Sequence, residues 1–195
     1  MIVLGVTGSM ASGKSSLTHR IRQVLKWPIW DADAEVQKLY QNITVIHHIG
    51  QLFPMAQTRE GLNRQNLRQA IIQDSSGLGK LESVLYPPLS ENRQRFWHQM
   101  QGLRIPIIVL DIPLLFEKNL QSICDITVVV TCPDWLQRQR ILKRPGMTES
   151  LMNRLLASQL SQTEKQKRAD IIIDSGLNHH HTWTQFMTLV VRKLQ

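Results

Sequence analysis

The sequence predicts an α/β fold in which five parallel strands form a doubly wound sheet with helices on both faces. Apolar, β-branched runs alternate with helical patterns along the chain, which is typical of this class. Several of these runs are apolar without alternation, as expected when helices cover both faces of a parallel sheet. A long stretch between the second and third runs has helical patterns and no convincing strand, which predicts a helical insertion.

The apolar runs give the predicted strands in chain order: residues 2–6, 29–31, 105–111, 126–131 and 171–174. Two stripes at helical spacing accompany them, and both are expected to pack on the sheet. The first stripe follows the first strand and comprises Leu17, Ile21, Val24 and Leu25. The second lies near the end of the chain and comprises Trp183, Phe186, Met187, Val190 and Leu194.

The composition is that of a globular protein, because 195 residues with 42% hydrophobic side chains can bury one sizeable core. No apolar run approaches the roughly 18 residues that a membrane-spanning helix needs, so no membrane partner is expected. The start of the chain lacks the pattern of a cleaved signal peptide. Cys124 and Cys132 each sit in or beside an apolar run, which favours thiols in a reducing cytoplasm over a disulfide.

Basic side chains are in excess, since 23 Lys and Arg stand against 15 Asp and Glu and give a formal net charge of +8. This balance points to anionic partners, either nucleic acid or phosphate-rich small molecules. The positive charge is spread along the chain without a dense basic tail, so nucleic acid is not the expected partner.

The stretch Gly8-x-x-x-x-Gly13-Lys14-Ser15 lies between the first strand and the first helical stripe, which is the setting of a phosphate-binding P-loop. The glycines permit backbone angles that a side chain would forbid and let peptide N–H groups turn toward phosphate oxygens. Lys14 supplies an ammonium for the β- and γ-phosphates, and the Ser15 hydroxyl suits Mg²⁺. The predicted nucleotide-binding residues here are Gly8, Ala11, Ser12, Gly13, Lys14, Ser15 and Ser16.

A pair of carboxylates, Asp31 and Asp33, closes the second predicted strand. The carboxyl ends of parallel strands face one crevice, so the pair is expected on the same side as the P-loop. One carboxylate would hold Mg²⁺ through water, and the other would accept the proton of an attacking hydroxyl, as a kinase requires. Either residue alone could instead cap the helix that begins near Ala34, and capping does not exclude catalysis.

Asp111 ends the third strand, where an aspartate that assists Mg²⁺ binding would stand, although a turn residue at a strand end is the alternative. Basic residues follow the fourth strand, and some of them belong to a solvated face. Others are placed to close over ATP as a lid, at about residues 136–160. We expect Arg140 to act in catalysis and Arg144 to contact ATP.

Several short motifs follow one another along the chain in a definite order. They are the P-loop, Asp31-Ala32-Asp33, Gly61-Leu62-Asn63-Arg64 with Leu67, Pro113-Leu114-Leu115-Phe116-Glu117, Cys132-Pro133, Gln137 with Arg140 and Arg144, Arg154 with Gln159, and Ala169-Asp170. In order and spacing they resemble the dephospho-coenzyme A kinases over nearly the whole chain. The resemblance implies a P-loop kinase-like fold and ATP-dependent phosphorylation of the ribose 3′-hydroxyl of dephospho-coenzyme A, giving coenzyme A. It places the catalytic base on Asp33, beside catalytic roles for Lys14, Asp31 and Arg140.

The same resemblance divides the chain into a nucleotide-binding core, residues 1–34 and 103–195, and a substrate-binding helical insertion, residues 35–102. It implies ATP and Mg²⁺ as cofactors, with Ser15, Asp31 and Asp111 serving the metal partly through water. No nucleic-acid, membrane or obligate protein partner is implied. The segment at about residues 136–160 is called the lid segment below.

The chain departs from the family pattern at a few positions. Ala11 stands where the family usually has glycine, which is tolerable if this position keeps an ordinary backbone angle. Tyr86-Pro87 replaces His-Pro in the insertion, and the run from Ile171 to Gly176 lacks an asparagine. These changes bear on contacts with the acceptor and with adenine rather than on the chemistry.

Three other functions fit a P-loop. Another small-molecule or nucleotide kinase differs only in its acceptor. A nucleotide-dependent switch protein is disfavoured, because the chain has no Asn-Lys-x-Asp motif for guanine and a second carboxylate would have no task. A nucleic-acid-binding ATPase is disfavoured, because the positive charge is spread along the chain without a dense basic tail. His179-His180-His181 is predicted to be an exposed helix start rather than a metal site.

Overall fold

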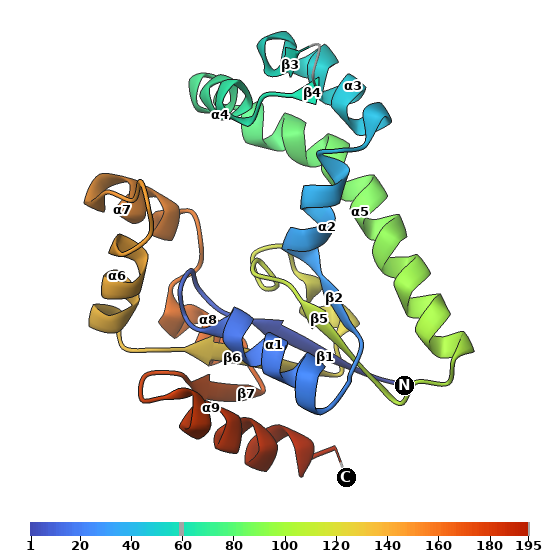
Figure 1. Ribbon diagram of the computed structural model, residues 1–195, viewed down its shortest axis with the longest axis vertical. Coiled ribbons are helices and arrows are strands. Elements are labelled where there is room, and N and C mark those ends of the chain that lie inside the picture. The colour runs from blue at the N-terminus through green and yellow to red at the C-terminus, as the bar shows by residue number, and fades with distance from the viewer. Residues whose placement is uncertain (59–60, 195) are drawn as a thin grey trace. The chain divides into compact units, whose positions relative to one another are not determined.

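The computed structural model describes residues 1–58 and 61–194 (Figure 1). The chain divides into two compact units, one of residues 1–30 and 104–195 and the other of residues 31–103. We call them the core unit and the inserted unit. Of the described helices, none is both long enough and apolar enough to cross a membrane.

A sheet of five strands has the order β2-β5-β1-β6-β7, which confirms the predicted α/β class. The strands are β1 (Ile2–Thr7), β2 (Ile29–Asp31), β5 (Ile107–Asp111), β6 (Ile126–Thr131) and β7 (Ile171–Asp174). Strand β1 runs parallel to both β5 and β6, and Gly5 lies opposite Leu110 on one side and Thr127 on the other. The central position of β1 carries the loop that follows it to the middle of the sheet edge.

Strand β5 begins at Ile107, two residues later than the sequence predicts. Pro106 lacks an N–H group and does not donate to a strand ladder. Its carbonyl still accepts from the Ile2 N–H at 2.7 Å, so the pairing with β1 starts there.

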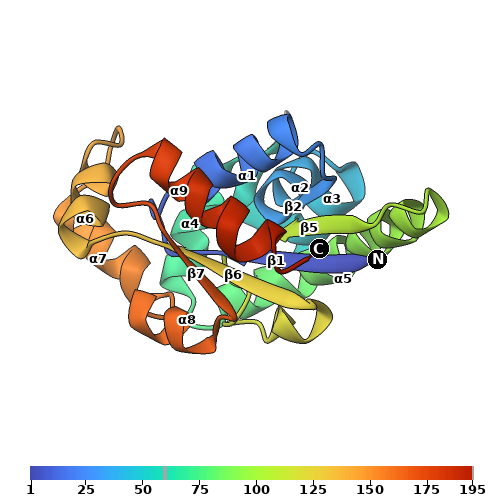
Figure 2. The same cartoon turned by 90° about the horizontal axis from the view of Figure 1, so that it is seen from below.

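Helices cover both faces of this sheet, with α1 and α9 on one face and α8 on the other (Figure 2). In the core unit the helical elements are α1 (Lys14–Val24), η2 (Leu120–Ile123), α6 (Asp134–Leu142), α7 (Glu149–Ala157), α8 (Gln162–Arg168), α9 (His179–Phe186) and the π-helical turn η3 (Met187–Val191). The lid segment therefore comprises most of α6, all of α7 and the connections around α7.

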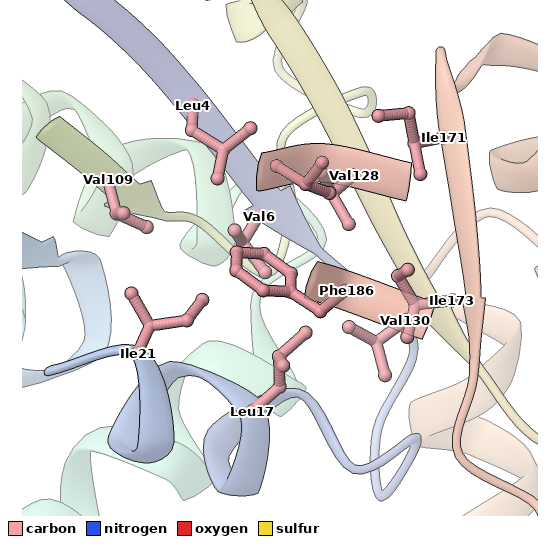
Figure 3. Packing of buried hydrophobic residues seen from close by; sticks show 11 residues of the cluster. Leu4, Val6, Leu17, Ile21, Val109, Val128, Val130, Ile171, Ile173 and Phe186 are labelled. Atoms are coloured by element: carbon pink, nitrogen blue, oxygen red, sulfur yellow. The ribbon is translucent and has the colours of Figure 1, made fainter. Parts of the chain in front are cut away.

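The main core lies between the sheet and the pair α1 and α9. Figure 3 shows the ring of Phe186 between the strand side chain of Val6 and the α1 side chains of Leu17 and Ile21. Both predicted helical stripes pack here, with one exception. Val24, the last residue of α1, is 56% exposed.

The inserted unit is helical, as predicted, and has a small core of its own. Its elements are α2 (Ala32–Leu39), α3 (Ile43–Leu52), η1 (Pro54–Ala56), β3 (Gln57–Thr58), β4 (Gly61–Leu62), α4 (Arg64–Gln73) and α5 (Gly77–Gly102). Its buried apolar residues are Val45, Ile49, Phe53, Ala56, Leu67, Leu81 and Leu85. The antiparallel pair β3 and β4 was not expected from the sequence, since strands of two residues are too short to show a pattern.

Candidate active site

The P-loop connects β1 to α1, and its two glycines meet two different physical requirements. Gly13 is the N-cap of α1 with φ of 93°, a left-handed conformation that disfavours any side chain. Gly8 is required for space, because a Cβ there would lie 2.5 Å from the Val130 carbonyl oxygen. The backbone can therefore fold closely around a small ligand at the positive end of the α1 dipole.

Alanine is tolerable at position 11 only if the backbone angle there is ordinary. The structure shows that it is not. The φ angle of Ala11 is 60°, so this residue too adopts the left-handed region. An L-residue with a Cβ is strained in this region by about 1–2 kcal/mol. Alanine therefore stands here at an energetic disadvantage that glycine would not have.

Two hydroxyls of the P-loop are buried without a partner among the residues that the structure describes, those of Ser9 and Ser12. A buried hydroxyl with no hydrogen bond carries a free-energy penalty unless a ligand satisfies it. Ser15 and Ser16 follow in the first turn of α1 with exposed side chains. The cradle thus offers unsatisfied donors and a helix N-terminus, which fits a phosphate group.

Lys14 and Asp111 form an ion pair in the core unit. Lys14 is the first residue of α1, and Asp111 is the last residue of β5 with a side chain that is 4% exposed. The carboxylate holds the ammonium group at the start of α1. The structure therefore brings together two of the residues that the sequence singles out for catalysis and metal binding.

Arg140 on α6 contacts two loops at once. Its guanidinium donates to the Oγ of Ser175 at 3.1 Å and to the Ser175 carbonyl at 3.0 Å, and it lies 3.5 Å from the Ala11 carbonyl. The Ser175 hydroxyl in turn donates to the Ser12 carbonyl. Arg140 therefore joins the loop after β7 to the P-loop.

The other arginines of the lid segment differ from Arg140 in their surroundings. Arg144 lies beyond the end of α6 with an exposed side chain. Arg138 pairs with Glu149 at the surface, so the solvated-face alternative holds for this residue. Lys165, from the same basic stretch of sequence, is fully buried instead.

Two glutamine side chains form hydrogen bonds with the backbone of the P-loop, which the residue types alone did not predict. Gln137 donates to the Met10 carbonyl at 2.8 Å, and the Gln159 side chain accepts from the Met10 N–H at 3.4 Å. Gln162 contacts Gln137, Asp134 and the backbone of Cys132. Gln137 and Gln159 were identifiable only through the family resemblance.

The Cys132 thiol lies in the same region. Burial raises its pKa, so this residue stays neutral.

The predicted carboxylate pair belongs to the inserted unit. Asp31 is the N-cap of α2, where its side chain accepts from the Ala34 N–H at 3.0 Å, so the capping role is confirmed for this member. Asp33 lies in the first turn of α2 with an exposed side chain.

Arg64, at the start of α4, reaches the side chains of α2 in the same unit. Its guanidinium donates to Gln37 and lies 5.1 Å from the centre of the Tyr40 ring. Burial raises the pKa of the Tyr40 hydroxyl, and the charge of Arg64 opposes that shift. The Arg64 guanidinium thus lies against α2, the helix whose first turn contains Asp33.

A magnesium ion suits the donors that the sequence singles out, which are hydroxyl and carboxylate oxygens. Within residues 1–58 and 61–194, no group of three or more His, Cys, Asp or Glu side chains could hold a metal ion. His179–His181 open α9, as predicted, with His179 and His180 exposed and His181 half-buried. Ser15, Asp31 and Asp111 remain the residues that the sequence predicts for Mg²⁺.

The strand order, the glycine cradle after β1 and the paired Lys14 define a P-loop phosphotransferase of the kinase type. A shikimate kinase from Bacteroides thetaiotaomicron shares this fold with a TM-score of 0.51 over 100% of this chain and 99% of that chain, at 12% identity.

The chain belongs to the dephospho-CoA kinase family, whose profile matches residues 2–180. The dephospho-CoA kinase of Zymomonas mobilis is 38% identical over 91% of this chain and 89% of that protein. The dephospho-CoA kinase of Novosphingobium aromaticivorans is 38% identical over 96% of this chain and 92% of that protein. A crystal structure from Thermus thermophilus matches with a TM-score of 0.86 and 27% identity, over 100% of this chain and 98% of that chain.

Proposed function

We propose that this protein transfers the γ-phosphoryl group of ATP to the ribose 3′-hydroxyl of dephospho-CoA, giving CoA and ADP. The observation that carries the proposal is the glycine cradle with its two unpartnered hydroxyls and Lys14, in a chain that belongs to the dephospho-CoA kinase family. The cradle accounts for the nucleotide, and the family accounts for the acceptor.

The core unit binds ATP in this proposal. Backbone N–H groups between Gly8 and Ser16 donate to phosphate oxygens, and Lys14 stabilises the negative charge that develops on the transferring group. Ser15, Asp31 and Asp111 hold Mg²⁺ partly through water. When bound, the metal neutralises phosphate charge and supplies a Lewis acid.

The inserted unit binds dephospho-CoA. Asp33 accepts the proton of the 3′-hydroxyl as its oxygen attacks the γ-phosphorus, which makes it the general base. Arg64, held by Gln37 on α2 and by Tyr40 at its C-cap, supplies a positive charge for the phosphates of the acceptor. Capping by Asp31 fixes the first turn of α2 and with it the start of the helix that carries Asp33.

The lid segment closes over ATP. Arg140 is already hydrogen-bonded beside the P-loop, which supports a role at the phosphates or the adenosine. Arg144, whose side chain is exposed in the structure, contacts ATP when the lid segment closes. The reaction needs no nucleic acid, membrane or obligate protein partner, and we place it in the cytoplasm.

A panel of acceptors tests this proposal. The protein with Mg·ATP is given dephospho-CoA, adenosine, a nucleoside monophosphate, shikimate or DNA, and ADP release is measured, with a further arm in which GTP replaces ATP. We expect release with dephospho-CoA far above that with any other addition. Lys14→Ala is the control and should lower turnover by about a hundredfold or more while staying folded. Equal release with another small acceptor identifies a different kinase, and stimulation by DNA identifies a nucleic-acid-dependent ATPase.

A further inference from the structure

Lys165 is a completely buried lysine for which the proposed reaction has no use. It lies on α8, and its side chain is 0% exposed. Lysine is almost never fully buried unless it is paired, because an ammonium group loses its hydration. Burial lowers the pKa of Lys165, pairing with Glu117 opposes that shift, and the charge of Lys14 adds to it. A group kept at this energetic disadvantage invites a functional explanation.

Two acceptors hold the Lys165 ammonium. It donates to the Pro113 carbonyl at 2.9 Å and lies 2.9 Å from Oε1 of Glu117, whose side chain is 13% exposed. The same Glu117 oxygen also accepts from the Leu160 N–H at 2.9 Å. The Pro113 carbonyl receives a second donor, the hydroxyl of Thr7, at 3.0 Å. These four residues and Lys165 form one hydrogen-bonded cluster around the buried ammonium group.

The cluster joins three segments that the reaction uses. Thr7 directly precedes Gly8, so it stands at the entrance to the phosphate cradle. Pro113 follows two residues after Asp111, the partner of Lys14. Leu160 is the last residue of the lid segment, where the chain returns to the core unit.

We propose that Lys165 is a positioning residue for phosphoryl transfer, which through Pro113 and Glu117 fixes the lid segment's return point against the ends of β1 and β5. It touches neither ATP nor the acceptor. Its effect falls on the placement of Asp111, Lys14 and the lid segment, and so on the rate of the chemical step. A misplacement of about 1 Å at such a distance can lower a rate by about a hundredfold.

The test compares Lys165→Met with the double variant Lys165→Met/Glu117→Gln. The single variant leaves a buried carboxylate without its cation, so its melting temperature should fall. The double variant removes both charges and should recover stability, while a glutamine oxygen can still accept from Leu160. For both we expect kcat to fall by about 10- to 100-fold, with the Kd of ATP nearly unchanged.

A matched control comes from the exposed side of the same helix. Lys167 and Glu164 form a pair at 2.8 Å with side chains 67% and 44% exposed. Lys167→Met/Glu164→Gln should leave kcat and melting temperature unchanged. Recovery of wild-type kcat together with stability in the Lys165→Met/Glu117→Gln variant would overturn the proposal and leave a structural ion pair. An equal loss of ATP affinity and kcat would overturn it as well.

The inference rests on the proposed kinase activity, and separate measurements test the inference and the activity. Turnover of dephospho-CoA by the unaltered protein tests the function. The ratio of variant to wild-type kcat, measured with the acceptor that proves most active, tests the role of Lys165.

Discussion

The residues of the phosphate cradle show why a motif has the residue types that it has. Gly13 meets a requirement of backbone angle, whereas Gly8 meets a requirement of space beside the Val130 carbonyl. Ala11 has a left-handed angle without the freedom of glycine. The sequence alone located all three positions. It did not separate the angle requirement from the space requirement, because both appear in a sequence only as glycine.

Replacing Ala11 by glycine should stabilise the protein. The left-handed angle strains a residue with a Cβ by about 1–2 kcal/mol, and part of that gain is lost to the greater freedom of glycine in the unfolded chain. We expect a net increase of about 1 kcal/mol in the free energy of unfolding, measured by urea titration. Ala70→Gly, in the interior of α4, is the control and should instead destabilise by about 1 kcal/mol. Equal losses in both variants would show that Ala11 is not strained.

The two aspartates should respond differently to removal of their charge. Asp33→Asn removes the proposed general base, and we expect kcat to fall by about a hundred- to ten-thousandfold with ATP affinity close to normal. Asp31→Asn keeps a good helix cap, since asparagine is as effective at that position, so any loss reports on the metal rather than on α2. We expect that loss to be partly restored by added Mg²⁺. The measurement is kcat against Mg²⁺ concentration for both variants. A normal kcat in Asp33→Asn with a Mg²⁺-independent loss in Asp31→Asn would reverse the assignment.

At the scale of elements, buried strands and amphipathic helices were predictable, because burial on both faces leaves a continuous apolar run and burial on one face leaves a stripe. Four of the five strands begin where the sequence predicts, and β5 starts late for lack of an N–H at Pro106. Side-chain contacts between elements were not predictable in the same way. The buried pair of Lys165 and Glu117 joins residues 48 positions apart, and its lysine looked in the sequence like part of a solvated basic face.

The helix α6 presents one arginine whose two-point contact can be tested. Arg140 donates through separate nitrogens to the Oγ and the carbonyl of Ser175, which an ammonium group cannot reproduce. We expect Arg140→Lys to lower kcat by about tenfold or more, although lysine keeps the positive charge. Arg138→Lys, at a surface pair on the same helix, is the control and should behave as the wild type. Full activity of Arg140→Lys in steady-state assays would remove Arg140 from the catalytic machinery.

For the whole molecule, the net charge of +8 and the two compact units have a common explanation in the proposed reaction. ATP and dephospho-CoA are both polyanions, so a basic protein that binds them needs no further anionic partner. In the proposed function, the core unit binds the nucleotide and the inserted unit binds the acceptor, which would give the long insertion between the second and third strands a substrate-binding role.

The position of the new phosphate is the most direct test of this account. The protein is incubated with Mg·ATP and dephospho-CoA, and the product is examined by phosphorus and proton NMR. We predict one new phosphate monoester, coupled to the proton on carbon 3 of the adenosine ribose, formed together with an equal amount of ADP. A phosphate on the 2′-hydroxyl or on the pantetheine arm, or ADP formed without a new monoester, would contradict the account.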